Sequence, residues 1–344
     1  MQENKNNNIV EKVIKAVMPP KDKWALVLEG GAMRSIFTAG VLDALQVNHL
    51  KTFDIVIGTS AGATCGTGFV SGQRRRMQNI FMNYLSGRRF FDFLRIFDGE
   101  KSALDLNFAI RKIGEEMVPL DLEAFCNSKT KTYVTLTNVE SGEAEYLQLD
   151  RYNTFDALVA TCNIPLLTPE PAQLNGKYYV DGGVVDPIPL QKAIDLGATK
   201  IVTVLTRPLG TKQKSRKMVT ALLKKLNPQF DHLQHLIEHE HSIYNRSKNF
   251  VETFQHSDIE QFIVSPPDNF RVDILTRNSK ILHEGYAQGF IAGLQIEETL
   301  KKRGLPKAPE TLPEKANEFL QSLPKKLNPN NKKKSLNGIK PDLI

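Results

Sequence analysis

The sequence has few cysteines and no long apolar stretch, and both absences limit what the protein can be. Its three cysteines, Cys65, Cys126 and Cys162, are odd in number and widely spaced. They match neither a disulfide framework nor a metal-ligand pattern, so a reducing compartment is the simpler interpretation. No stretch approaches the roughly 20 apolar residues of a membrane-spanning helix, and residues 1–20 contain no apolar core for a signal peptide. We therefore expect a cytoplasmic protein that contacts membranes at most peripherally.

Positive charge is in modest excess, and much of it lies near the C-terminal end. Lysine and arginine outnumber the acidic residues by 45 to 38. Residues 305–344 hold eight lysines against four acidic residues, together with six prolines, which is typical of a partly disordered tail. We expect a polar extension over residues 1–22, one domain over residues 23–304 and a Pro/Lys-rich tail beyond it. The basic excess favours contact with anionic surfaces.

Short apolar runs alternate with helical patterns through the first part of the chain. The run at 24–29 is followed by apolar residues at helical spacing over 35–47, and the run at 53–57 by small residues that can continue as a helix. This alternation predicts an α/β fold with a mostly parallel central sheet and helices on both faces. Further elements are expected as a hairpin over 133–149, strands at 177–180, 201–205 and 262–264, and a helix over 279–303.

Residues 58–64, GTSAGAT, place a serine between two glycines after an apolar run. In the pattern G-x-S-x-G, a sharp turn from strand to helix exposes the serine hydroxyl, and a side chain at either glycine would collide with its neighbours. The turn also puts Ser60 at a helix N-terminus, where unpaired N–H groups favour developing negative charge. Ser60 is therefore the candidate nucleophile, supported by Gly58 and Gly62. The alternative is a glycine-rich turn with an idle serine.

A second glycine-rich segment, EGGAMR at residues 29–34, also follows an apolar run and precedes a helical pattern. It does not fit the dinucleotide fingerprint G-x-G-x-x-G, because Ala32 and Ser35 stand where glycines belong, and it lacks the Gly-Lys-Ser/Thr of a phosphate-binding loop. Acyl transfer creates an oxyanion, which preorganised backbone N–H groups can stabilise. An oxyanion hole is the interpretation that agrees with both the expected geometry of this loop and the chemistry of acyl transfer. The alternative is a plain strand-to-helix turn.

A third segment, YVDGGVVDP at residues 179–187, places Asp181 at a strand end before Gly182 and Gly183. Asp-Gly is common in turns, but beside a nucleophilic serine this aspartate becomes a candidate general base. With an ordinary pKa of about 3.9, a carboxylate is a weak base at neutral pH. Burial disfavours the ionised form and raises the pKa, which lowers the cost of taking the serine proton.

In this order, the three segments resemble those of the patatin-like phospholipases. The segment ATCNIP at 160–165 is also similar to one that precedes Asp-Gly-Gly in that family, and the resemblance covers roughly residues 23–300. It implies a three-layer α/β/α fold with a mostly parallel sheet. It also implies hydrolysis of lipid acyl esters, of the phospholipase A or lysophospholipase type, through an acyl-enzyme and without a metal or cofactor.

The resemblance assigns roles to individual residues. It makes Ser60 the nucleophile and Asp181 the base of a catalytic dyad, and it implies an oxyanion hole from the backbone N–H groups of Gly30, Gly31 and Ala32. The family usually has glycine at the position of Ala32. Alanine keeps its N–H, so the donor survives where the local φ angle suits a residue with a Cβ.

Two neighbouring positions complete the comparison with the family. Ser35 also stands where the family usually has glycine, which bears on the geometry of the loop but not on its chemistry. Arg34 has two interpretations, an anchor for an anionic head group or a brace for the loop.

Other interpretations stay open. A Ser60–Asp181–His283 triad would need a histidine in a loop, whereas His283 lies in a helical pattern. The spacing of His235 and His239 allows metal binding, but no acidic pattern singles the pair out, and a solvated helix face is favoured. The same fold could also bind a lipid or a protein partner without turnover, or act as a thioesterase or transacylase.

Two basic and apolar regions are candidates for contact with an anionic membrane surface. Residues 207–228 contain seven basic residues, no acidic residue and apolar residues at helical spacing, as an interfacial helix would. Residues 74–76 are three arginines, and residues 88–91 read RRFF. A helix packed on the core with a charged rim is the alternative for both regions. No nucleic-acid-binding module is present, so the expected partner is a lipid or phospholipid.

Overall fold

The computed structural model of the chain describes residues 22–47, 53–92, 94, 102–165, 167–168, 170–215 and 231–305. Almost all of the expected N-terminal extension and C-terminal tail lies outside the described residues. So does the apolar stripe of the expected interfacial helix, because residues 216–230 are not described.

Within the described residues, eight strands form one sheet in the order β5-β6-β3-β2-β1-β7-β8, with β4 also paired to β3. The strands β3, β2, β1, β7 and β8 are parallel neighbours, whereas β4 and β6 run antiparallel to β3 and β5 runs antiparallel to β6. The strands span Trp24–Leu28 (β1), Ile55–Thr59 (β2), Lys131–Asn138 (β3), Ala144–Gln148 (β4), Ala172–Leu174 (β5), Lys177–Asp181 (β6), Lys200–Val204 (β7) and Glu260–Val264 (β8).

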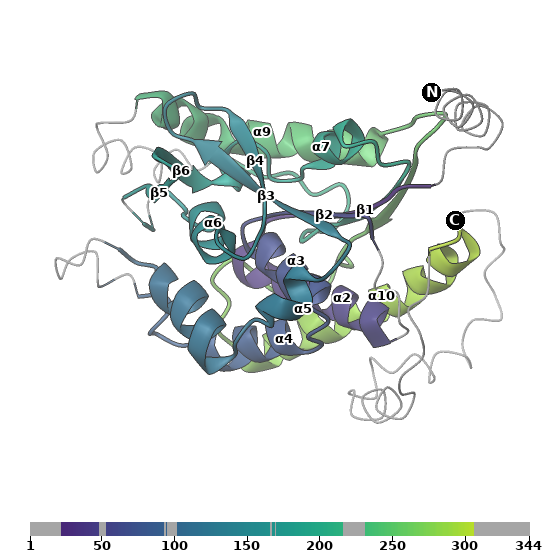
Figure 1. The fold of residues 1–344 in the computed structure, drawn as a ribbon, viewed down its shortest axis with the longest axis horizontal. Helices are drawn as coiled ribbons and strands as arrows, with labels where there is room; N and C mark the ends of the chain where they lie inside the picture. Colours follow the sequence, from purple (N-terminus) through teal and green to yellow (C-terminus); the bar gives the residue numbers. More distant parts are fainter. Residues whose placement is uncertain are drawn as a thin grey trace, which may run out of the picture.

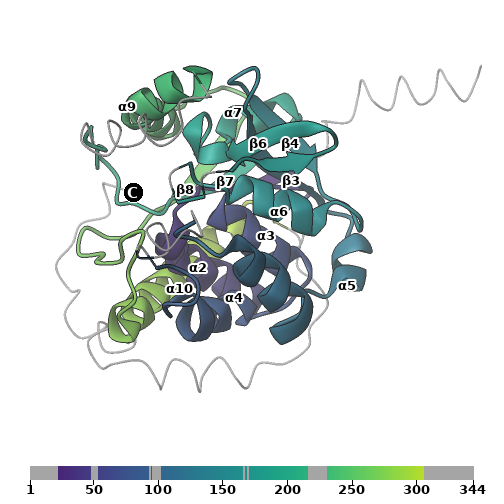
Figure 2. The ribbon, with the colours of Figure 1, turned by 90° about the vertical axis from the view of Figure 1, so that its left-hand side faces the viewer.

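Helices cover both faces of this sheet. Figure 1 shows α9 and α7 above the sheet and α2, α3, α4, α5 and α10 below it, and the view in Figure 2 keeps that division. The expected three-layer α/β/α architecture with a mostly parallel sheet is therefore confirmed. The α-helices span Ile36–Val47 (α2), Ala61–Val70 (α3), Arg76–Ile80 (α4), Leu122–Cys126 (α5), Thr154–Thr161 (α6), Leu190–Asp195 (α7), Asp231–Thr253 (α9) and Ser279–Lys302 (α10).

Alternate residues of the central strands supply the two cores. Leu26 and Leu28 of β1 pack with Ile36 of α2 below the sheet, whereas Ala25 and Val27 pack with residues of α7 above it. Because successive side chains of a strand point to opposite faces, a strand covered on both faces must be apolar throughout. This is why β1 and β2 read as continuous apolar runs.

Most predicted elements are present with small shifts in their boundaries. The second strand begins at Ile55 rather than Phe53, and the hairpin over 133–149 is the pair β3–β4. Two segments were not anticipated: residues Phe81–Leu85 (η2) and Asn107–Met117 (η4) form π-helices. Two short 3-10 turns, Ala32–Ser35 (η1) and Gly182–Val184 (η5), follow β1 and β6. None of the helices in the described ranges is both long and apolar enough to cross a bilayer.

The helices α2 and α10 approach each other closely at glycines. A Cβ added to Gly40 of α2 would lie 2.2 Å from the carbonyl oxygen of Tyr286. A Cβ added to Gly289 of α10 would lie 2.0 Å from the carbonyl oxygen of Phe37. Neither position can hold a side chain unless the helices separate, so α10 lies directly on the backbone of α2. Tyr286 also donates a hydrogen bond to the buried carboxylate of Asp43 at 2.7 Å.

Candidate active site

Ser60 lies at the sharp turn between β2 and α3. Its φ of 53° and ψ of −131° fall in a region that a residue with a Cβ rarely adopts. The glycines beside it are required by packing. A Cβ on Gly58 would lie 2.7 Å from the backbone nitrogen of Ala63, and a Cβ on Gly62 would lie 2.6 Å from the carbonyl oxygen of Glu29. The turn thus presses α3 against the end of β1, and it holds Ser60 in a fixed direction.

Thr161 at the end of α6 helps to hold this turn. Its hydroxyl accepts the backbone N–H of Ser60 at 2.9 Å and donates to the carbonyl oxygen of Thr135 at 2.7 Å. The Ser60 backbone amide is therefore engaged within the protein. The sequence assigned no role to Thr161, although the residue lies in the segment at 160–165 that resembles one of the family.

The strand register brings Asp181 to the serine. Thr59 pairs with Thr135 across β2 and β3, and the next residue of β3, Leu136, pairs with Asp181 of β6. The Ser60 hydroxyl donates to Asp181 Oδ2 at 2.6 Å. The two residues that were expected to act together are thus in direct contact.

Two glycines hold the Asp181 carboxylate in position. The backbone N–H of Gly183 donates to Asp181 Oδ1 at 2.7 Å. A Cβ on Gly182 would lie 2.2 Å from the carbonyl oxygen of Thr135, so this turn has no room for a larger residue. Each carboxylate oxygen of Asp181 therefore has its own donor.

The surroundings of Asp181 raise its pKa to about 7. Burial is the largest cause, because it penalises the charged carboxylate, and the negative charge of Glu240 adds to it. The hydrogen bonds from Ser60 and Gly183 act in the opposite direction. A carboxyl group with a pKa near neutrality can both accept and return a proton under physiological conditions.

The glycine-rich loop after β1 lies against the same turn. The N–H of Gly30 is donated to the carbonyl oxygen of Pro187, which leaves Gly31 and Ala32 as the amides without a hydrogen bond among the described residues. A Cβ on Gly31 would lie 2.7 Å from Thr206 Oγ1. Ala32 adopts a φ of 46°, a left-handed conformation that strains a residue with a Cβ.

Charged side chains brace this loop from behind. Glu29 is fully buried, and its carboxylate accepts the N–H of Thr206 at 2.6 Å and the hydroxyl of Tyr244 at 3.0 Å. Arg34 is buried as well, and burial is the main reason that its pKa falls to about 10. Its Nη1 lies 3.8 Å from Asp273 but has no hydrogen-bond partner in the described residues. The arrangement is compatible with both interpretations of Arg34.

A cavity of about 490 Å³ opens onto Ser60, Asp181, Gly31 and Ala32. Apolar side chains form most of its wall, and polar and charged side chains form the rest. The apolar wall includes Met77, Ile80, Phe81, Leu85, Phe90, Leu104, Leu106, Ala109, Ile110, Leu120, Phe155, Leu158, Ile164 and Leu167. The polar wall includes Arg34, Arg207, Gln213, Lys214, Glu238, Glu240, His241 and Tyr244.

The sequence assigned several residues of this cavity no role in the site. Arg207 follows β7, and its Nε is buried without a hydrogen-bond partner in the described part of the chain. Its guanidinium lies over the ring of Tyr244, 5.1 Å from the ring centre. Glu240, which acts on Asp181, comes from α9. Only the fold brings these residues to the serine.

Other candidates from the sequence lie elsewhere. His283 is exposed on α10, donates to the carbonyl oxygen of Ser279 and does not line the cavity. The structure therefore does not bring a Ser60–Asp181–His283 triad together. Cys65 is buried in the core, and burial raises the pKa of its thiol.

Comparison with known proteins gives a family match and proteins that are similar over most of this chain. The family model for patatin-like phospholipase matches residues 26–194. The uncharacterized protein YjjU of Escherichia coli is 30% identical over 294 residues, which cover 83% of this chain and 80% of that protein. VipD from Legionella pneumophila, a solved structure, shares 14% identity over 81% of this chain and 67% of that one, with a TM-score of 0.46.

Two relatives carry names that state an activity. The 1-acylglycerol-3-phosphate O-acyltransferase Pnpla3 of Mus musculus is 30% identical over 51% of this chain and 42% of that protein. The lysophospholipase NTE1 of Debaryomyces hansenii is 27% identical over 52% of this chain and 11% of that protein. This chain spans less than half the length of either relative. The family model and the length of the match to YjjU place it plainly: the chain belongs to the patatin-like phospholipase family, and this membership supports a lipid hydrolase activity.

Proposed function

We propose that the protein hydrolyses acyl esters of lipids, as a phospholipase A or lysophospholipase, through a Ser60–Asp181 dyad and an acyl-enzyme. The observation that carries the proposal is the hydrogen bond of 2.6 Å from the Ser60 hydroxyl to Asp181 in the wall of a cavity with a large apolar side. A hydroxyl fixed against a base beside an apolar cavity suits attack on a long-chain ester.

In the first half of the reaction, Asp181 accepts the Ser60 proton while the serine oxygen attacks the acyl carbonyl carbon. The carbonyl oxygen becomes an oxyanion, which the N–H groups of Gly31 and Ala32 stabilise together with the N-terminal end of α3. The tetrahedral intermediate then expels the alcohol part of the lipid, and Asp181 returns the proton to the leaving oxygen. Ser60 is left as an acyl ester.

In the second half, water replaces the alcohol. Asp181 takes a proton from the water molecule while the water oxygen attacks the acyl carbonyl carbon. The second tetrahedral intermediate releases the fatty acid, and the proton on Asp181 returns to Ser60. A pKa of about 7 for Asp181 suits both directions of transfer, because the group is near half-ionised at neutral pH.

The composition of the cavity wall supports a lipid as the substrate. Its apolar side would bury the acyl chain and gain the free energy of removing it from water. On the polar side, Arg34 and Arg207 would face an anionic group on the alcohol part of the lipid.

Labelling with a fluorophosphonate probe tests the nucleophile directly. The wild-type protein should label and Ser60→Ala should not, and Ser60→Ala should lose hydrolysis of a lipid panel by several orders of magnitude. No labelling of the folded wild-type protein would refute the proposal and favour a protein that binds lipid or a partner without turnover. Acyl-CoA and lysolipid acceptors in the same panel separate thioesterase and transacylase activity from hydrolysis.

The base is tested by a pair of substitutions. Asp181→Asn should lower kcat by about a thousandfold or more, whereas His283→Ala should leave kcat within about twofold, because His283 is exposed and does not line the cavity. Retained activity in Asp181→Asn together with loss in His283→Ala would replace the dyad with a triad.

A further inference from the structure

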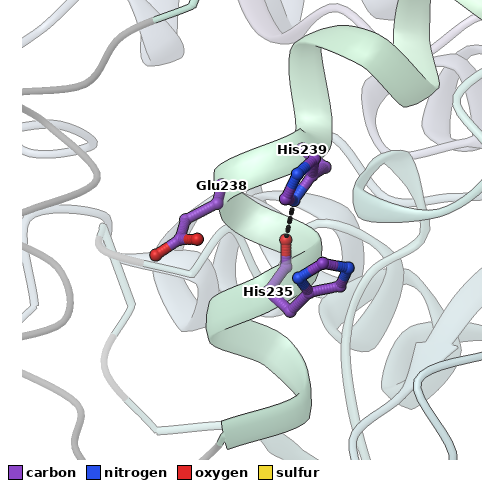
Figure 3. Close-up of side chains that lie close together, drawn as sticks. All are labelled: His235, Glu238 and His239. Carbon is purple, nitrogen blue, oxygen red and sulfur yellow. Dashed lines mark hydrogen bonds between the residues drawn. The ribbon is translucent and has the colours of Figure 1, made fainter.

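The segment HLIEH at residues 235–239 places three potential metal ligands on one side of α9. Residues three and four positions apart are neighbours on a helix surface, so His235, Glu238 and His239 lie close together. Figure 3 shows the two histidines one turn apart, with Glu238 beside them. One ligand atom from each residue lies within 4.8 Å of the other two. Glu238 supplies the acidic donor that the histidine spacing alone lacks.

The orientation of His239 allows its other ring nitrogen to bind a metal ion. Its Nδ1 lies 2.9 Å from the carbonyl oxygen of His235. A carbonyl oxygen can only accept, so Nδ1 carries the proton and Nε2 has a lone pair. Metal-binding histidines commonly donate their second nitrogen to a carbonyl in this way, which fixes the tautomer and the ring.

The spacing is wider than that of a bound ion by a distance that side chains can cover. Zinc–nitrogen and zinc–oxygen bonds are about 2.0–2.2 Å long and tetrahedral, so two ligand atoms of one ion lie about 3.4 Å apart. The present limit of 4.8 Å exceeds this by about 1.4 Å. Both histidines are exposed, so side-chain rotations can close this gap without moving the backbone.

We propose that His235, Glu238 and His239 form a binding site for a divalent transition-metal ion of the zinc class. Two imidazoles and one carboxylate are a donor set that favours zinc over magnesium or calcium, which prefer oxygen ligands. The exposure of the site leaves the remaining coordination positions to water. The site is separate from the Ser60–Asp181 dyad, and its existence does not depend on the proposed hydrolase function.

The site also borders the catalytic cavity. Glu238 contributes to the cavity wall, as do Glu240 and His241 of the same helix. With neutral histidines, the three ligands carry one negative charge, and a divalent ion changes this to one positive charge. If the protein is a lipid hydrolase as proposed, the bound ion should attract anionic substrates to this side of the cavity. It should therefore lower KM for an anionic lipid more than for a neutral ester, with kcat little changed.

Calorimetric titration of the full chain with zinc tests the site. The protein must carry no affinity tag, since a histidine tag would bind zinc itself, and it is first stripped with a chelator. The wild type should bind one ion, and His235→Ala and His239→Ala should each weaken binding by at least about tenfold. His283→Ala and His256→Ala are matched controls on other segments and should bind as the wild type does. Magnesium should give no saturable binding over the same range.

Two results would overturn the site. One is the absence of saturable binding of a single zinc ion to the wild type. The other is unchanged binding in the double variant His235→Ala/His239→Ala. Circular dichroism before titration verifies that each variant is folded, and these substitutions lie on an exposed face. Because the readout is binding, loss of hydrolase activity for any other reason does not affect the result.

Discussion

The Ser60 hydroxyl and the Asp181 carboxylate meet at 2.6 Å, and less than a tenth of either residue is exposed to solvent. Burial raises the pKa of this carboxyl group, and the hydrogen bonds that it accepts from Ser60 and Gly183 lower the pKa in part. The resulting pKa of about 7 is the property on which a dyad without histidine depends. It also makes the site measurable through its response to pH.

The dependence of activity on pH should report this carboxyl group. Asp181 can accept a proton only when it is ionised, so kcat/KM for a neutral ester should rise with pH and level off above about 7. Below that value it should fall about tenfold per pH unit. Initial rates between about pH 5 and 9 test this. A profile that stays flat down to the ordinary pKa of an aspartate would contradict a buried base.

Ionisation of Asp181 should lower the stability of the folded protein as the pH rises, whereas it raises activity. Because the pKa of Asp181 is higher in the folded state than its ordinary value of 3.8, the folded protein holds a proton that the unfolded chain has released between these two values. The free energy of unfolding should therefore fall as pH rises from about 4 to about 7 and stay low above it.

Asp181→Asn removes this cost while keeping the shape of the side chain. The variant should unfold at a higher temperature than the wild type at about pH 8, with the difference shrinking as the pH falls towards 4. Thermal unfolding followed by circular dichroism measures it. A constant difference at all pH values would show that ionisation of Asp181 is not the cause.

The strained conformation of Ala32 and the close packing of Gly31 predict different effects on activity and stability for substitutions at these two positions. Ala32→Gly places glycine at a φ of 46°, so it should retain activity and change stability by less than about 1 kcal/mol, because relief of strain offsets the entropy of glycine. Gly31→Ala puts a Cβ 2.7 Å from Thr206 Oγ1 and should cost about 1–3 kcal/mol. It should also lower kcat by displacing the oxyanion donors. Equal effects of the two changes would refute this account of the loop.

Arg207 should select for charge on the substrate. Arg207→Gln should raise KM for an anionic lipid by about tenfold or more, because a hydrogen bond to a charged group contributes about 1.5–3 kcal/mol. The same variant should leave KM for a neutral ester within about twofold. Arg271→Gln, which removes a surface ion pair with Glu284, is the matched control. If the neutral ester is affected as strongly, Arg207 has a structural role.

The size of the side chains in the apolar wall should determine how long an acyl chain the cavity accepts. Ala109 of η4 lines the cavity, so Ala109→Phe should lower kcat/KM for long-chain esters while esters of short acids remain substrates. Lys112→Phe, on the exposed side of the same helix, should leave the chain-length profile unchanged. Rates on a series of p-nitrophenyl esters measure both variants. An equal loss at every chain length would indicate a general defect.

Much of the fold and the centre of the candidate site could be predicted from the sequence. The glycine-rich motifs mark turns after strands, and the geometry of a parallel sheet brings such turns together. Ser60 and the loop at 29–34 each follow a parallel strand, and the carboxyl ends of parallel strands meet at one edge of the sheet. Asp181 could be assigned to the site only from its Asp-Gly-Gly turn and the family resemblance. The strand β6 is antiparallel to β3, and no local sequence pattern predicts the register between them.

The rest of the site depends on tertiary placement. Thr161 lies in the family-like segment at 160–165 and Arg207 begins the basic region at 207–228, but neither pattern predicts the contacts that the fold gives these residues. The choice among the proposed oxyanion donors also needed coordinates, because the N–H of Gly30 donates to the carbonyl oxygen of Pro187, a residue far away in the chain. The π-helical form of residues 107–117 has no sequence signal, since its apolar residues also fit an α-helix.

The contact between α2 and α10 bears on how the protein can be shortened. The family model ends at residue 194, but the helix that lies on α2 begins at Ser279. A truncated chain that stops at the end of the matched region would keep every proposed catalytic group and still uncover the apolar side of its first long helix. The limits of the family model are therefore not the limits of an independently folding unit, and expression fragments should extend past Leu305, whose side chain is 3% exposed.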